Sequence, residues 1–183
     1  MDRTSSLLDR NLGPSAEFNV LDKFKYLDQK EVAQSYQDSS LPFVIALKNL
    51  TSDFNKSSAI RNANNFGARA VVLIGNKHWD RRGAVGTHNY IPVLHASNTF
   101  ELFDMFPGYS LVAAENNVPS ESLLGFRFPD LSIILFGEET LGLAAEDLAL
   151  ADYVVAIPSM GTVRSINVAS AAGIMSYEYV RQR

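Results

Sequence analysis

The feature that most constrains the fold of this chain is a series of short apolar runs separated by helix-like segments. The first two runs, FVIAL at 43–47 and AVVLIG at 70–75, are rich in β-branched residues, which is typical of strands buried on both faces. The stretch between them reads as a helix, capped by Asp53 or Asn55 and ended by Gly67. The alternation continues, with apolar runs at 91–94, 110–114, 131–136 and 153–157 and expected helices at 98–105, 142–149 and 165–181. This pattern predicts an α/β fold, a parallel sheet flanked by helices.

The chain of 183 residues is long enough for one such domain with a short extension. Residues 1–16 are polar and contain a Gly13-Pro14 breaker, so we expect a mobile lead-in there. Residues 17–37 place apolar side chains among charged ones and predict an amphipathic helix. We therefore divide the chain into a partly helical N-terminal extension, 1–40, and an α/β domain, 41–183.

Composition removes several classes of protein. An apolar share of 46% with 20% charged residues excludes a disordered chain, a coiled coil and a collagen-like fibre. The absence of cysteine excludes disulfides, thiolate nucleophiles and zinc sites built on cysteine. Because no apolar run approaches the ~20 residues that span a bilayer, and the first residues lack the apolar core of a signal peptide, we expect a cytoplasmic protein.

Charge is distributed unevenly along the sequence. The net charge is −4, which by itself argues against a nucleic-acid partner. However, residues 41–100 carry seven basic and two acidic side chains, whereas residues 101–183 carry four basic and eleven acidic ones. A phosphate-bearing partner senses the field within about 8–10 Å rather than the total charge. The basic third therefore keeps RNA open as a partner, unless folding disperses this charge.

Common catalytic and binding motifs are absent. No G-x-G-x-x-G follows an expected strand, and Gly137 and Gly142 have P-loop spacing without the Lys and Ser or Thr that should follow. There is no G-x-S-x-G elbow and no H-E-x-x-H pair, and the three histidines are too widely spaced to suggest a metal site. We therefore expect no metal.

Three segments carry more information. Residues 53–67 place several Asn and Ser residues and Arg61 on one helix face, where they could hold a ribose and its phosphates. Residues 133–143 form an expected buried strand that runs into a glycine turn, and ligands of open α/β sheets bind at such strand ends. Residues 157–173 form a Pro- and Gly-containing loop followed by a helix of small residues opened by Ser165. Taken singly, each also fits an ordinary capped helix or tight turn.

Taken together and in this order, the segments resemble the SpoU (TrmH-like) family of the SPOUT superfamily, which are RNA 2′-O-ribose methyltransferases. The resemblance covers about residues 41–181. The family patterns are roughly N-x-G-x-x-x-R-x-A-x-x-F-G, G-x-E-x-x-G-[LM] and I-P-M-x-G-x-x-x-S-L-N-V-[SA]. They are matched here by Asn55, Arg61, Ala63, Phe66 and Gly67, by Gly137, Glu139, Gly142 and Leu143, and by Ile157, Pro158, Gly161, Ser165, Asn167 and Val168. The departures are Ser57 for a glycine, which could alter the approach of the ribose, Ser159-Met160 for Met-x, and Ile166 for leucine.

The resemblance implies a methyltransferase domain over 41–183 with a C-terminal deep trefoil knot. It implies that S-adenosyl-L-methionine lies in the knot crevice and that the enzyme is a homodimer through the knot and the last helix. Ala169, Ala172, Gly173 and Tyr177 could serve that packing. By position, the cofactor would lie among Phe136, Gly137, Ile157, Pro158, Met160 and Ile166. The catalytic set would be Arg61 with Asn55, Glu139, Ser165 and Asn167, which fix Arg61, the ribose and the methionine end of the cofactor.

RNA contact is expected in the basic third. The segment after the strand at 70–75 mixes cations with an aromatic ring that can stack on a base, and we assign RNA binding to Lys77, His78, Trp79, Arg81 and Arg82. A solvated loop is the other reading of this segment. Two alternatives to an enzyme acting on tRNA or rRNA stay open: a catalytically silent RNA-binding protein of the same fold, and an unrelated small α/β enzyme or nucleotide-binding protein.

Overall fold

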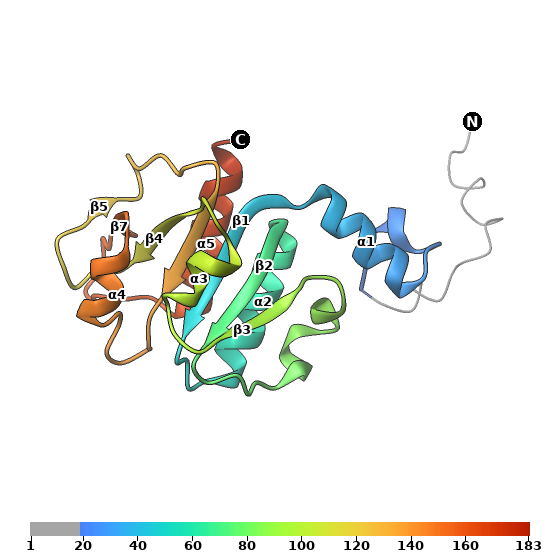
Figure 1. Ribbon diagram of the computed structural model, residues 1–183, viewed down its shortest axis with the longest axis horizontal. Helices are drawn as coiled ribbons and strands as arrows, with labels where there is room; N and C mark the ends of the chain where they lie inside the picture. The colour runs from blue at the N-terminus through green and yellow to red at the C-terminus, as the bar shows by residue number, and fades with distance from the viewer. Residues whose placement is uncertain (1–18) are drawn as a thin grey trace.

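The computed structural model describes residues 19–183 and places seven parallel strands in one sheet (Figure 1). The order across the sheet is β3-β2-β1-β6-β4-β7-β5. The strands are β1 (Leu41–Lys48), β2 (Ala68–Ile74), β3 (Val93–Ala96), β4 (Ser110–Ala114), β5 (Glu121–Ser122), β6 (Ser132–Phe136) and β7 (Tyr153–Ala156). The helices are α1 (Gln29–Ser39), α2 (Asp53–Asn65), α3 (Glu101–Met105), α4 (Ala145–Leu150) and α5 (Val168–Arg181). The parallel α/β class predicted from the apolar runs is confirmed.

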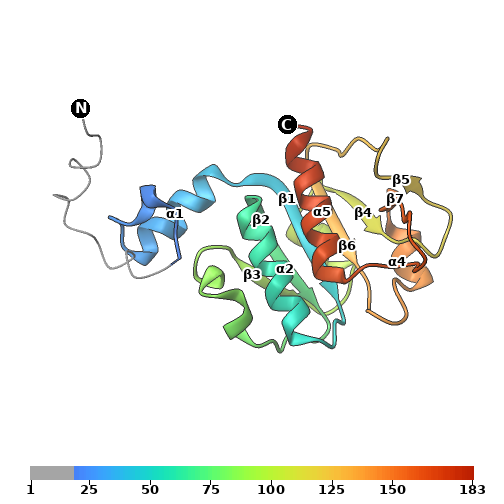
Figure 2. The ribbon, with the colours of Figure 1, turned by 180° about the vertical axis from the view of Figure 1, so that it is seen from behind.

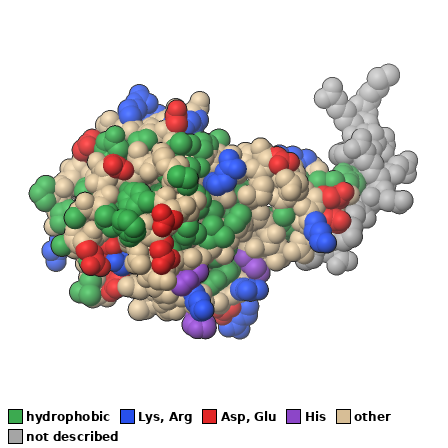
Figure 3. All heavy atoms as spheres, in the orientation of Figure 1, with side chains coloured by type: hydrophobic (Ala, Val, Ile, Leu, Met, Phe, Trp, Pro, Cys, Tyr) green, Lys and Arg blue, Asp and Glu red, His purple; other side chains and the backbone are tan. Residues whose placement is uncertain are grey.

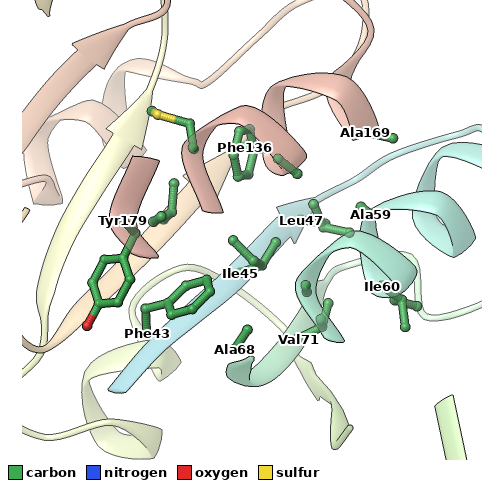
Figure 4. Packing of buried hydrophobic residues seen from close by; sticks show 14 of the residues in the cluster. Phe43, Ile45, Leu47, Ala59, Ile60, Ala68, Val71, Phe136, Ala169 and Tyr179 are labelled. Atoms are coloured by element: carbon green, nitrogen blue, oxygen red, sulfur yellow. The ribbon is translucent and has the colours of Figure 1, made fainter. Parts of the chain in front are cut away.

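The two faces of the sheet are covered by different helices. Alternate residues of the central strands point to opposite faces, so Phe43, Ile45 and Leu47 of β1 join one cluster and Val44 and Ala46 join the other. Helices α2 and α5 lie side by side on the first face (Figure 2), and their small residues allow close packing on the sheet (Figure 4). Helix α3 and the partly buried side chains of α4 pack on the second face. Burial on both faces explains why these strands are uninterrupted apolar runs.

The N-terminal extension is less helical than expected. The prediction of one helix over 17–37 is wrong in extent, because a short 3₁₀ turn, η2 (Asp22–Phe24), precedes α1. Helix α1 begins after Asp28, which accepts from the Glu31 backbone N–H at 2.9 Å, while the Glu31 carboxylate accepts from the Asp28 N–H at 2.7 Å. This capping box fixes the start of the helix. The expected lead-in over 1–16 lies outside the described residues.

Several helix and strand ends also differ from the sequence prediction. Ser52 caps α2, in place of Asp53 or Asn55, because its hydroxyl accepts from the Asn55 N–H at 3.3 Å. Helix α5 begins after Asn167 rather than at Ser165, because the Asn167 side chain accepts from the backbone N–H groups of Ala169 and Ser170. Strand β5 was not foreseen, since two polar residues carry no apolar pattern. Within the described part of the chain, no helix has the length and apolar character to cross a membrane.

Candidate active site

A cleft of about 920 Å³ lies at the carboxyl ends of β4, β6 and β7. This is the edge where open α/β sheets bind ligands. The loops that follow these strands and the first turns of α2 and α5 form its walls. Its lining includes Asn55, Glu115, Phe136, Gly137, Glu138, Glu139, Ile157, Pro158, Arg164, Ser165, Ile166 and Asn167.

A chain of hydrogen bonds joins the three motifs within this cleft. The Asn55 amide donates to the Glu139 carboxylate at 3.1 Å, and the Asn167 amide donates to the Asn55 side-chain oxygen at 2.8 Å. Glu139 also accepts from the backbone N–H groups of Thr51 and Ser52, at 3.2 and 3.3 Å. The first turn of α2, the glycine turn after β6 and the cap of α5 are thereby fixed relative to one another.

The Glu139 carboxylate is held ionised by this network. Partial burial raises its pKa, but the hydrogen bonds from Asn55 and from the Thr51 and Ser52 backbone outweigh burial, so its pKa lies below the ordinary value. The Thr51 hydroxyl donates as well, at 3.3 Å, and a carboxylate of lowered pKa that is occupied by four donors is a poor proton acceptor. The Glu139 carboxylate instead holds Asn55 in place and joins the loop after β6 to the backbone of residues 51 and 52.

The glycine turn after β6 closes on itself. The backbones of Glu138 and Gly142 exchange two hydrogen bonds, at 3.1 and 3.0 Å, and a Cβ on Gly137 would lie within 2.2 Å of the Gly142 carbonyl carbon. Gly142 has φ +71°, a conformation that side chains rarely adopt. Both glycines are therefore required by the turn itself. From the sequence alone, Gly137 was interpreted only as a residue that lets a ligand touch the backbone.

Glu115, at the end of β4, was missed by the sequence analysis. It is buried, and its carboxylate accepts from the backbone N–H groups of Leu143, Asn116 and Asn117 at 2.8–3.0 Å and from the Asn117 amide at 3.1 Å. It thus joins the loop after β4 to the turn after β6. The only sequence signal was an acidic residue directly after an apolar strand.

The structure brings most of the expected cofactor residues together. Phe136, Gly137, Ile157, Pro158 and Ile166 all line the cleft, whereas Met160 lies outside the lining and is 87% exposed. The loop that carries Met160 is tied back to the sheet by Asn116, whose amide donates to the Arg164 carbonyl at 2.5 Å. Among residues 19–183, no group of three or more His, Asp or Glu side chains is arranged to hold a metal ion.

The expected catalytic residues divide into two groups. Asn55, Glu139, Ser165 and Asn167 line the cleft, but Arg61 does not. Arg61 is exposed on α2, and its guanidinium makes no hydrogen bond or ion pair with any described residue. The other four therefore do not fix Arg61 within this protomer, contrary to the sequence interpretation.

Ser57, which stands in place of the family glycine, points away from the cleft. It is fully buried, and its hydroxyl donates to the Asp80 carbonyl in the segment that follows β2. A Cβ on Gly83 would lie 2.7 Å from the Ser57 Cβ, so this segment packs directly on α2. The expected effect of Ser57 on a ribose in the cleft is not supported by this position.

The small residues of α5 also pack within the protomer. Ala169 and Ala172 are buried in the core, and a Cβ on Gly173 would meet the Asn62 amide at 3.0 Å. The expectation that these three residues pack against a second copy is wrong, because α2 already occupies that face. Tyr177 is 55% exposed, so its side chain is available for contact with a second copy.

The basic segment, residues 77–82, follows the carboxyl end of β2 and packs on α2. Lys, Arg and His side chains gather at the lower edge of the view in Figure 3. Lys77, His78 and Arg81 are exposed. Trp79 is half-buried against the core, with its indole edge-on to the His88 ring at 5.5 Å. The Arg82 guanidinium is paired with the Asp80 carboxylate, with Nε–Oδ2 at 2.8 Å, so its charge is partly neutralised.

Comparison with known proteins identifies the relatives of this fold and cleft. The model of the SpoU rRNA Methylase family matches residues 42–177. The 23S rRNA (uridine(2479)-2'-O)-methyltransferase of Streptomyces viridochromogenes is 31% identical over 144 residues, which cover 73% of this chain and 50% of that protein. The tRNA (guanosine(18)-2'-O)-methyltransferase of Mus musculus is 36% identical over 76 residues, which cover 42% of this chain and 5% of that protein. The chain thus spans half or less of these curated relatives.

Among solved structures, the SpoU methyltransferase AviRb from Streptomyces viridochromogenes in complex with the cofactor AdoMet matches with a TM-score of 0.70. It is 28% identical, and the match covers 81% of this chain and 63% of that one.

Proposed function

The chain belongs to the SpoU rRNA methylase family, and from this premise we propose that it transfers a methyl group from S-adenosyl-L-methionine to a ribose 2′-OH of tRNA or rRNA. The observation that carries the proposal is the hydrogen-bonded chain of Asn55, Glu139 and Asn167, which unites the three motifs in one cleft. The two curated relatives are named for 2'-O-methylation, one of rRNA and one of tRNA, so both substrates are retained. The domain assignment of 41–183 and a cytoplasmic location form part of this proposal.

The cleft fits the cofactor in size and chemistry. Its volume of about 920 Å³ lies within the ~300–1,000 Å³ typical of ligand pockets. Phe136, Ile157 and Ile166 offer apolar surface for the adenine, and the backbone at Gly137 and Pro158 offers polar groups. When bound, S-adenosyl-L-methionine supplies an electrophilic methyl group on a cationic sulfur. Met160, outside the lining, would contact it only after the loop 157–167 moves.

The protein's own residues would act mainly by positioning. Arg61 remains charged at all working pH values, so we assign it to an RNA phosphate and to lowering the pKa of the 2′-OH electrostatically rather than to taking the proton. Asn55, Ser165 and Asn167 line the cleft, where their amide and hydroxyl groups would contact the ribose. Correct alignment of the reacting atoms can lower such a barrier by about 7–11 kcal/mol.

A homodimer would explain why Arg61 stands outside the cleft. Large apolar side chains are exposed on the loop before α5 and on α5 itself, among them Val163, Ile174 and Tyr177. Exposed apolar groups concentrated on one region are typical of an interface. We propose that this region packs on a second copy, that the loop 157–167 forms a trefoil knot, and that the dimer brings Arg61 of one copy to the cleft of the other.

Two measurements on the full chain test the activity. Calorimetry should show binding of S-adenosyl-L-methionine, and radiolabelled methyl transfer to bulk tRNA and rRNA, followed by nuclease mapping, should show a 2'-O-methylated nucleotide. Arg61→Ala should lower transfer by more than about 100-fold and leave cofactor affinity within twofold. Transfer at the normal rate by this variant contradicts the role of Arg61. Cofactor and RNA binding without transfer by the wild type would instead identify a catalytically silent RNA-binding protein.

The shared site is tested by mixing two inactive variants. Arg61→Ala and Asn167→Ala subunits that are co-expressed should recover up to about one quarter of the wild-type rate, because half of the dimers are mixed and each carries one intact site. If Arg61 acts in its own protomer's cleft, the mixture stays as inactive as either variant.

A further inference from the structure

A second cavity, of about 440 Å³, lies between α1 and the segment that joins β2 to β3. Its two walls come from regions far apart in the sequence, because Ala33 and Gln37 belong to the N-terminal extension. None of the three motifs contributes to it. The remaining lining residues are Trp79, Arg81, His88, Asn89, Tyr90, Ile91, Pro92 and Val93.

The cavity contains polar groups that lack partners. The Gln37 side-chain Nε2 and the His88 Nδ1 are both shielded from solvent, and neither has a hydrogen-bond partner among residues 19–183. A buried polar atom left without a partner costs about 1–3 kcal/mol. Both side chains line the cavity, so a ligand seated there contacts the two side chains whose polar atoms are unpaired among the described residues.

The walls combine aromatic surface with positive charge. The Trp79 indole and the His88 imidazole lie edge to face at 5.5 Å, and Tyr90 lies beside them in the lining. Burial, followed by the nearby Arg81 charge, lowers the pKa of His88, so the ring is neutral near pH 7 and offers one donor and one acceptor. Arg81 is exposed at the cavity, and no carboxylate lines it.

This combination is the chemistry that recognises a nucleotide: aromatic rings and amide or imidazole edges for the base, and a guanidinium for the phosphate. We propose that this cavity binds the base of an RNA nucleotide other than the methylated one, an inference that rests on the RNA substrate of the proposed function. Gln37 and His88 contact that base, and Arg81 binds its phosphate.

The cavity is rigidly linked to the helix that carries Asn55 and Arg61. The Lys56 Nζ donates to the His78 carbonyl at 2.5 Å, and the Ser57 hydroxyl donates to the Asp80 carbonyl. Both anchors hold the segment after β2 on α2. A nucleotide seated in the cavity therefore sets the position of its RNA relative to α2, and the N-terminal extension acquires a role in substrate choice.

The only tryptophan of the chain, Trp79, provides a local probe. We expect its single indole N–H resonance in the ¹⁵N-labelled full-length protein to shift saturably with at least one of AMP, GMP, CMP and UMP, and not with ribose 5-phosphate. Gln37→Ala and His88→Ala should each weaken this response at least about fivefold. The control Gln34→Ala, on the exposed side of the same helix, should leave it unchanged.

The inference is overturned if no nucleotide shifts the resonance, if ribose 5-phosphate shifts it equally, or if Gln37→Ala responds like Gln34→Ala. Gln37 lies on α1, outside both core clusters, so this variant decides the matter even if His88→Ala fails to fold. Methyl transfer is measured separately on the same samples. A silent Trp79 in an active enzyme overturns this inference alone, whereas nucleotide binding without transfer overturns the proposed function alone.

Discussion

The cleft at the carboxyl ends of the strands and the basic segment after β2 are built in opposite ways. In the cleft, carboxylates and amides are already paired: Glu115 accepts four hydrogen bonds, and Glu139 joins Asn55 to the backbone of the loop after β1. In the basic segment the backbone is anchored to α2, but Lys77 and Arg81 extend into solvent. The cleft is therefore preorganised, whereas the basic segment has an anchored backbone that carries the exposed cationic side chains of Lys77 and Arg81, unpaired among residues 19–183.

This difference separates two kinds of binding. A small cofactor needs a cleft whose polar groups hold one geometry before the ligand arrives, because alignment to within fractions of an ångström determines the rate. RNA binding draws most of its free energy from phosphate charge, which tolerates movement of long side chains. Variants in the cleft should thus change the reaction and the fold, whereas variants in the basic segment should change RNA affinity alone.

The largest effect is expected at Asn167. Asn167→Ala removes both the cap of α5 and the bond to Asn55, so transfer should fall more than about 100-fold and the free energy of unfolding by about 0.5–2 kcal/mol. Asn167→Asp keeps a capping oxygen but loses the amide donor. It should lose transfer to a similar degree while retaining thermal stability. Initial rates and thermal unfolding of both variants test this, and an active Asn167→Asp enzyme would remove Asn167 from the reaction.

A smaller effect, on stability and cofactor affinity, is expected at Glu115. Glu115→Gln replaces one accepting oxygen with a donor that faces backbone N–H groups, so the free energy of unfolding should fall by about 1–3 kcal/mol. Binding of S-adenosyl-L-methionine should weaken with it, whereas RNA affinity should not change. Glu121→Gln, on exposed β5, is the matched control and should alter stability by less than about 0.5 kcal/mol. Equal denaturation midpoints for the two variants would show that Glu115 does not hold the loops.

Next in size is the loss of charge from the basic segment. Replacing Lys77, Arg81 and Arg82 together by Ala should weaken RNA binding and reduce the slope of log K against log salt by about two. Arg82 should contribute least, because Asp80 already neutralises it. Cofactor binding should stay the same. A salt titration of RNA binding measures this, with Arg127→Ala as control, and an unchanged slope would assign the segment to a solvated loop.

The smallest effect concerns the Asp80–Arg82 pair. Hydrogen bonds from the Arg82 side chain and then its backbone lower the pKa of Asp80 from 3.8 to about 2. Because the folded value is depressed, the stabilisation is fully present above pH 3.8 and is lost as the pH falls through about 2. Arg82→Ala should raise the pKa of Asp80 toward 3.8 in an NMR titration. No change in that titration would mean that Arg82 is free to bind RNA.

The sequence predicted the sheet well where strands are long and apolar. Strands β1, β2, β4, β6 and β7 lie within about two residues of the apolar runs, because burial on both faces leaves an uninterrupted signal. The prediction was less accurate for β5 and η2, whose residues are polar and are placed by their neighbours. At the site, three separated motifs identified Asn55, Glu139 and Asn167. No pattern identified Glu115, because one of its donors, the Leu143 N–H, belongs to a loop 28 residues further along the chain.

What the sequence by itself determined is the fold class, the family and the three motifs that meet at the cleft, because strand patterning and motif order are properties of the chain. What only the tertiary structure decided is which of those residues meet. It placed Arg61 outside the cleft lining, Ser57 under the basic segment, and Gln37 in the same cavity as His88. The physical reason is that contacts between distant segments follow from how helices pack on the sheet, and this packing leaves no periodic signal in the sequence.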